Sequence, residues 1–89
     1  MKKIKLNSGV TLNIEDDVLN NMELLDDLVA MDNGDWRAMS NVMQKVLKDE
    51  ERKKLYDAIR NEKGVVQIDT VSDALNEIFG KLGETGKNS

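Results

Sequence analysis

The chain has 89 residues, the size of one small domain, with a formal net charge of −4, no cysteine and no histidine. The missing cysteines exclude disulfides and thiolate metal sites, and the missing histidines remove the commonest general base and metal ligand at neutral pH. The acidic balance disfavours DNA or RNA binding, and no apolar run is long enough for a signal peptide or a membrane span.

The first segment, residues 2–14, alternates between polar and apolar side chains. Its apolar positions are Ile4, Leu6, Val10, Leu12 and Ile14, and Asn7-Ser8-Gly9 separates the two runs. Alternation with period two around a short loop that contains glycine predicts a β-hairpin. Because a lone hairpin is marginally stable in water, we expect it to lie on the helices that follow.

At Glu15 the apolar period changes from two to that of a helix. The expected inner stripe consists of Val18, Met22, Leu25 and Val29. Asp16 and Asp17 would occupy the first turn, where the helix dipole favours negative charge, and Asp32-Asn33-Gly34 would end the helix.

Three more amphipathic helices are predicted after Gly34. Asp35 would cap the second, lined by Trp36, Met39, Met43 and either Val46 or Leu47. Asp49 would cap the third, with Leu55, Ala58 and Ile59 facing inward and Lys63-Gly64 at its end. After an extended link over residues 65–68, Thr70 would begin the fourth, with the stripe Val71, Leu75, Ile78 and Leu82. The expected fold is mainly α (α+β): a hairpin and about four helices in a single domain, residues 1–82, with a flexible polar tail, residues 83–89.

The helix–glycine–helix order around Gly64 is that of an EF-hand. In such a loop Ile59 would be the first ligand, Lys63 the fifth-position ligand and Thr70 the last. Ile59 and Lys63 offer no oxygen, and Thr70 cannot replace a bidentate glutamate. The sequence therefore predicts no calcium site, no other metal site and no cofactor.

The segment around the first helix is strongly acidic. No lysine or arginine lies between Lys5 and Arg37, whereas eight acidic residues do: Glu15, Asp16, Asp17, Glu23, Asp26, Asp27, Asp32 and Asp35. One interpretation is a solvated helix face. The other is an acidic surface that docks on a basic partner or on the basic third helix of a neighbouring copy.

The apolar faces of the first two helices are wider than one-sided packing requires. The residues beyond the expected inner stripes are Leu24, Leu28, Met31, Val42 and Val46. Either the two helices pack on two sides, or these five residues form an exposed patch that binds a partner. The five methionines of the chain fit a surface that accepts varied apolar segments, and they equally fit a core that needed filling.

The order of these segments resembles a known family. It comprises Lys2-Lys3-Ile4-Lys5-Leu6-Asn7-Ser8-Gly9, an acidic leucine-rich helix, Asp32-Asn33-Gly34-Asp35, Asn61-Glu62-Lys63-Gly64-Val65-Val66, Glu77-Ile78-Phe79 and Gly86-Lys87-Asn88-Ser89. Over nearly its whole length the chain resembles the small tail assembly chaperones of long-tailed phages and prophages of Gram-positive bacteria. The likeness lies in the overall pattern, since none of these motifs is catalytic.

This resemblance implies a cytoplasmic protein, absent from the mature virion, that is not an enzyme. It would bind and solubilise the tape measure protein while the tail tube assembles around it. The family also makes a longer product by ribosomal frameshifting, which recruits the tail tube protein. Gly86-Lys87-Asn88 permits a slippery A-AAA-AAY codon run at this position.

Two further expectations concern partners. A coat along a long client requires neighbouring copies to touch, so we expect at least a weak homo-oligomer, helped by the acidic early and basic later segments.

The alternative function is that of a small acidic phage or prophage protein that inhibits a basic host factor by stoichiometric binding. No nucleic acid or membrane partner is expected.

Overall fold

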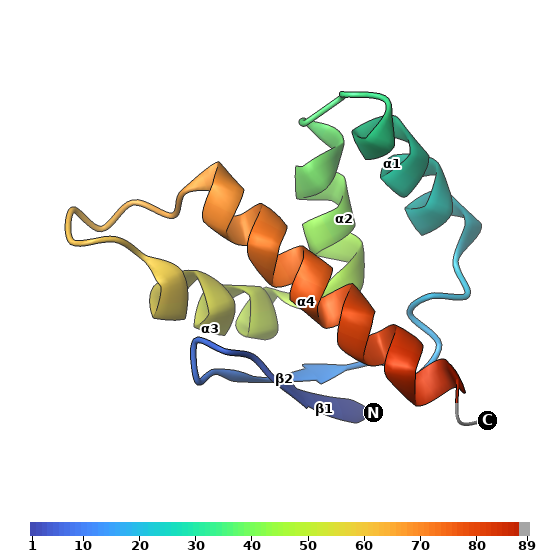
Figure 1. Cartoon of the computed structure of the whole chain (residues 1–89), viewed down its shortest axis with the longest axis horizontal. Coiled ribbons are helices and arrows are strands. Elements are labelled where there is room, and N and C mark those ends of the chain that lie inside the picture. The colour runs from blue at the N-terminus through green and yellow to red at the C-terminus, as the bar shows by residue number, and fades with distance from the viewer. Residues whose placement is uncertain (88–89) are drawn as a thin grey trace.

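The chain begins with an antiparallel hairpin of β1 (Lys2–Lys5) and β2 (Thr11–Ile14), seen in a computed structural model that describes the backbone of residues 1–87 and the side chains of residues 1–83 (Figure 1). Ile4 lies opposite Leu12, and Gly9 adopts a φ of +96° in the connecting loop. That conformation suits glycine because it has no Cβ. The predicted hairpin and its apolar face are confirmed, with Ile4 and Leu12 buried.

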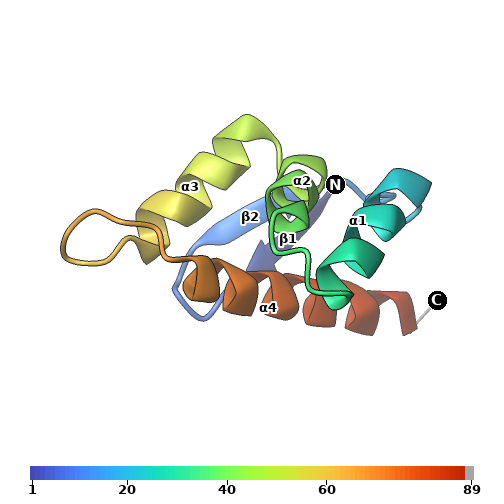
Figure 2. The same cartoon turned by 90° about the horizontal axis from the view of Figure 1, so that it is seen from above.

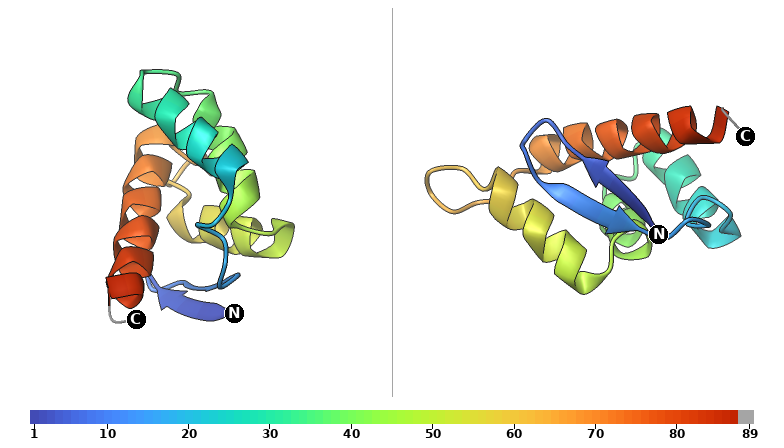
Figure 3. Two further views of the ribbon diagram at one scale, coloured as in Figure 1. Left: turned by 90° about the vertical axis from the view of Figure 1, so that its right-hand side faces the viewer. Right: turned by 90° about the horizontal axis from the view of Figure 1, so that it is seen from below.

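Four helices follow the hairpin, and with it they form a single small domain, which confirms the predicted fold class. They are α1 (Met22–Asp32), α2 (Ala38–Val46), α3 (Asp49–Ile59) and α4 (Ile68–Lys87). Figure 1 shows α1 beside α2 and the hairpin at the opposite end of the molecule. The long α4 runs along one side of the other helices (Figure 2). Seen from below, the hairpin lies across α3 and α4 (Figure 3).

The core draws apolar side chains from every one of these elements. Its most completely buried members are Leu12, Ile14, Leu24, Val42, Met43, Leu47, Leu55, Leu75 and Ile78. No polar or charged side chain is buried among the described residues. The predicted stripe of the fourth helix is confirmed, since Val71, Leu75, Ile78 and Leu82 are all buried.

Side chains of α4 bond to the backbone at the end of β1 and in the loop that follows it. The backbone N–H of Asn7 donates a hydrogen bond of 2.7 Å to Glu77 Oε2, and Lys81 Nζ donates to the carbonyl oxygen of Lys5. Glu77 and Lys81 also form an ion pair of 3.1 Å one turn apart on the helix. These contacts satisfy backbone groups that a bare edge strand would offer to another chain.

The first helix starts later than the sequence predicted. Residues 15–20 form turns, and the helix begins at Met22 because Asn21 caps it: the Asn21 side chain accepts hydrogen bonds from the N–H groups of Glu23 (2.9 Å) and Leu24 (3.3 Å). The placement of Asp16 and Asp17 in a first helical turn is therefore wrong. Val18 is buried, but it reaches the core from a turn.

The other helix ends also differ from their predicted positions. Lys48 rather than Asp49 is the N-cap of α3, and Ala58 on that helix is exposed. α4 begins at Ile68, before Thr70, because Val71 N–H already bonds to the carbonyl of Gln67 at 3.1 Å. The helix continues through Lys87, beyond the predicted start of the tail at residue 83, while residues 88–89 lie outside the described part of the chain.

Candidate protein-binding surfaces

The five residues that the sequence proposed for partner binding do not form an exposed patch. Leu24, Val42 and Val46 are buried, and Leu28 and Met31 are half-buried against the same core. For α2 the two-sided packing interpretation holds, because that helix packs against both α1 and α3. The prediction of an exposed patch made of these residues is wrong.

Three of the four residues of the expected inner stripe face outward instead. Met22, Leu25 and Val29 are exposed along α1, and Leu19 is exposed in the turn before it. We call these four residues the outer stripe. The side of α1 that packs into the molecule carries Leu24, Leu28 and Met31, spaced i, i+4, i+7. At about 100° per residue, the helix is thus rotated by roughly a third of a turn relative to the sequence-based expectation, because two apolar stripes were available to the core.

Two hollows flank Met22 at the start of the outer stripe. The apolar hollow, about 250 Å³, is lined by Leu19, Asn20, Asn21, Met22, Leu24, Leu25 and Leu28. The acidic hollow, about 460 Å³, is lined by Glu15, Asp17, Val18, Asn20, Asn21, Met22, Glu23 and Lys45. An apolar and an acidic recess therefore lie side by side, sharing Asn20, Asn21 and Met22.

The acidic residues of this region divide into paired and unpaired groups. Glu15 forms an ion pair of 2.7 Å with Lys48, and Asp27 pairs with Lys45. The hydrogen bond and negative charge of Glu15 raise the pKa of Lys48. Four acidic side chains form no ion pair or hydrogen bond with any described residue: Asp17, Glu23, Asp26 and Asp32. Their negative charge remains available to a partner.

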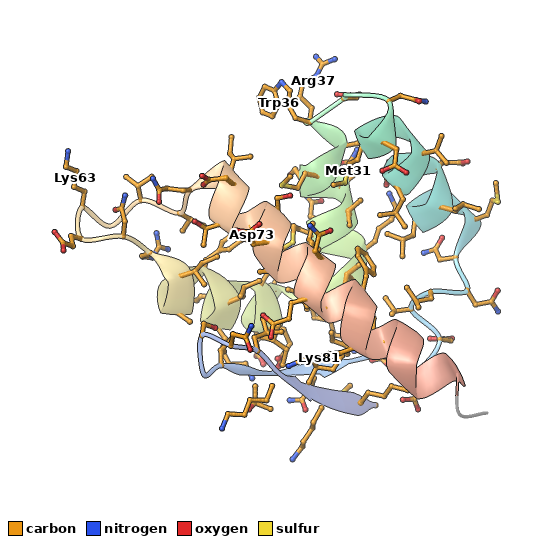
Figure 4. The ribbon with its side chains drawn as sticks, in the orientation of Figure 1. Met31, Trp36, Arg37, Lys63, Asp73 and Lys81 are labelled. Atoms are coloured by element: carbon orange, nitrogen blue, oxygen red, sulfur yellow. The ribbon has the colours of Figure 1, made fainter. Side chains whose placement is uncertain are left out.

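A second apolar surface lies around Trp36, at the start of α2. A groove of about 240 Å³, which we call the Trp36 groove, is lined by Trp36, Arg37, Met39, Ser40, Met43, Tyr56, Val66, Ile68 and Val71. These residues come from α2, α3, the link before α4 and the first turn of α4. The Trp36 residue is 64% exposed and Ile68 is 57% exposed. Figure 4 shows Trp36 and Arg37 projecting from the segment before α2.

The prediction that Trp36 lines the inner face of the second helix is wrong. The helix begins at Ala38, two residues later. Asp35 accepts hydrogen bonds from the Arg37 backbone N–H (3.2 Å) and from Arg37 Nε (3.3 Å), and these bonds hold a turn just before the helix. The local signal for this turn was Asp35, because an aspartate side chain often accepts a hydrogen bond from the backbone N–H two residues later. The apolar periodicity that includes Trp36 had favoured a helix over the same residues.

No group of three or more carboxylates in the described part of the chain is placed to hold a metal ion. Among the described helices, none is long and apolar enough to cross a membrane. No protein-family model matches the chain, and comparisons with curated proteins and with solved structures found no match.

Proposed function

We propose that this protein is a phage tail assembly chaperone that binds and solubilises the tape measure protein in the host cytoplasm while the tail tube assembles. The Trp36 groove carries the proposal, because a mainly apolar recess bordered by an exposed tryptophan has the composition found at the core of protein–protein interfaces. The resemblance of the segment order to tail assembly chaperones names the client. The protein acts by binding, without catalysis and without a cofactor.

The side chains of the groove suit a client whose sequence varies along its length. The half-buried Met39 lines it, and methionine adapts to different apolar partners because its side chain is unbranched and polarizable. The Trp36 ring supplies a large apolar contact with a polar N–H at its edge. Such a groove holds apolar side chains of many shapes and shields them from aggregation.

The proposal includes a longer, frameshifted form of the protein that recruits the tail tube protein. The short form coats the client, and the long form tethers tube subunits to it at high effective concentration. Its test is the nucleotide sequence at Gly86-Lys87-Asn88. A codon other than GGA for Gly86, AAG for Lys87, or no open −1 frame contradicts frameshifting at this position.

Co-expression with the tape measure protein tests the main proposal. The full chain should keep the client in the soluble fraction, and Trp36→Ser combined with Ile68→Ser should lose that effect. Lys53→Ser, a change at an exposed residue of α3 that does not line the groove, serves as the control and should retain it. Client binding should also shift the emission of Trp36, the only tryptophan, to shorter wavelength. A tape measure protein that aggregates equally with and without the chain would overturn the proposal.

A further inference from the structure

We propose that the outer stripe of α1 docks an amphipathic helix of the partner whose apolar stripe is flanked by lysine or arginine. This inference deepens the proposed function by naming the chemistry of the segment that is bound. It rests on the proposed function for the identity of the client. Its surface is separate from the Trp36 groove: the two share no lining residue.

The apolar half of the surface has the form that accepts a helix. Met22, Leu25 and Val29 recur at i, i+3 and i+7, so they form one row along the exposed side of α1. Beside that row lies the apolar hollow, with Leu24 and Leu28 among its lining residues. A row of side chains next to a recess is the arrangement into which the ridge of a second helix packs.

The charged half of the surface selects the partner. At about 100° per residue, Asp26 falls next to Met22 and Val29 on the exposed side of α1, and Asp32 falls next to Leu25. Both carboxylates lack an ion pair with any residue that the structure describes, and the acidic hollow adds the unpaired Asp17 and Glu23. Lys45 and Lys48 already pair with Asp27 and Glu15, so a partner's cations would be needed only for the four unpaired carboxylates.

The same charges argue against other occupants of the outer stripe. Two copies that met face to face through this stripe would bring Asp26 and Asp32 of one copy close to those of the other, and like charges at an interface are repulsive. Nucleic acid phosphates and anionic lipid headgroups would meet the same repulsion. A basic amphipathic helix is the occupant that satisfies both the apolar row and its acidic border.

The test uses a labelled synthetic helix of about 20 residues, long enough to be helical, with a leucine stripe flanked by lysines. Its matched control has glutamate in place of every lysine. Fluorescence anisotropy with the full chain should show binding of the basic peptide at least about tenfold tighter than of the acidic one. Raising the salt from about 50 to about 500 mM should weaken binding of the basic peptide.

Two pairs of variants locate the site. Val29→Ser should weaken binding of the basic peptide at least about threefold, whereas Val65→Ser should not; the two valines are 51% and 52% exposed, on different surfaces. Asp26→Asn with Asp32→Asn should lower affinity and flatten the salt dependence. Glu50→Gln with Glu62→Gln removes the same formal charge elsewhere and should change little.

The outcomes separate this inference from the proposed function. Equal affinity for the two peptides, or equal effects of Val29→Ser and Val65→Ser, overturns the inference while leaving tape measure binding to its own test. If only the aspartate changes weaken binding, the contact is purely electrostatic and the proposed apolar docking fails. A basic peptide that binds as expected to a chain that does not solubilise the tape measure protein supports the inference and contradicts the proposed function.

Discussion

The backbone N–H of Asn13 donates a hydrogen bond of 2.9 Å to Glu51 Oε2, linking β2 to α3 across 38 positions of sequence. Glu51 also pairs with Lys54 at 3.0 Å, and Lys54 Nζ donates to the carbonyl oxygen of Thr11 at 3.1 Å. On the other side of the hairpin, Glu77 and Lys81 of α4 bond to the backbone of Asn7 and Lys5, so a glutamate–lysine pair from a helix satisfies two backbone groups on each side. A two-stranded hairpin needs such support because it is marginally stable alone.

The contact between Glu51 and Asn13 predicts a pH dependence of stability. Burial raises the pKa of Glu51, but the hydrogen bonds from Asn13 and Lys54 and the charge of Lys54 outweigh it, so the pKa lies below its ordinary value of 4.5. The stability that ionised Glu51 contributes is therefore complete above the ordinary pKa and is lost as the pH falls through the lower, folded pKa. Thermal melts of Glu51→Gln between about pH 6 and about pH 2 should show a shallower loss of stability than the unchanged protein.

Glu50→Gln is the matched control for that experiment. Glu50 is the exposed neighbour of Glu51 and forms no hydrogen bond or ion pair with a described residue. Its replacement should leave the acid limb of the stability curve unchanged. A Glu51→Gln curve that runs parallel to that of Glu50→Gln at every pH would contradict the assigned role of the Asn13 contact.

Adjacent leucines on α1 provide a test of the orientation of the helix. Leu24 is 1% exposed and Leu25 is 50% exposed. Leu24→Ala should lower the free energy of unfolding by about 2–5 kcal/mol, because it opens a cavity in the core. Leu25→Ala should change it by no more than about 0.5 kcal/mol. Urea denaturation of the two variants measures both values, and the reverse order would mean that the outer stripe is the one that packs into the core.

Trp36 should be dispensable for folding. Because its side chain lies largely in solvent, Trp36→Ser should change the free energy of unfolding by no more than about 0.5 kcal/mol. A tryptophan on the inner face of a helix would instead cost about 3–5 kcal/mol when truncated. Acrylamide should also quench the Trp36 emission of the free protein strongly, and weak quenching together with a large loss of stability would place the ring in the core.

Two glycine-to-alanine changes should have opposite effects on the stability of the protein. Gly64 adopts a φ of +82° in the turn after α3, so Gly64→Ala should destabilise the protein by about 1–2 kcal/mol. Gly80 lies within α4, where alanine is the better helix former, so Gly80→Ala should stabilise it by about 0.5–1 kcal/mol. An added Cβ meets no atom within 4 Å at either position, so backbone conformation alone sets the sign. Thermal melts with the same sign for both variants would contradict this account.

The sequence alone was sufficient to predict the hairpin, the number of helices and the inner face of the last helix. In each case one pattern was available: Ile4 and Leu12 alternate with polar residues, and Val71, Leu75 and Ile78 form a single stripe. When a segment has only one apolar face, burial of that face follows from the hydrophobic effect, whatever packs on it. The starts of α1 and α2 were not predicted correctly, because the side chains of Asn21 and Asp35 form local hydrogen bonds that apolar periodicity does not reveal.

The candidate binding surfaces depended on tertiary structure. Residues 22–31 contain two apolar stripes with the same helical period, one through Leu24 and Leu28 and the other through Leu25 and Val29. The two stripes have the same periodicity, so the sequence pattern cannot show which of them is buried. The packing of α1 on α2 placed Leu24 in the core with Val42 and left Leu25 and Val29 exposed. The sequence by itself thus determined that α1 has apolar surface to spare, whereas only the fold decided which residues form it, because the core accepts one face of a helix and leaves the other to solvent or to a partner.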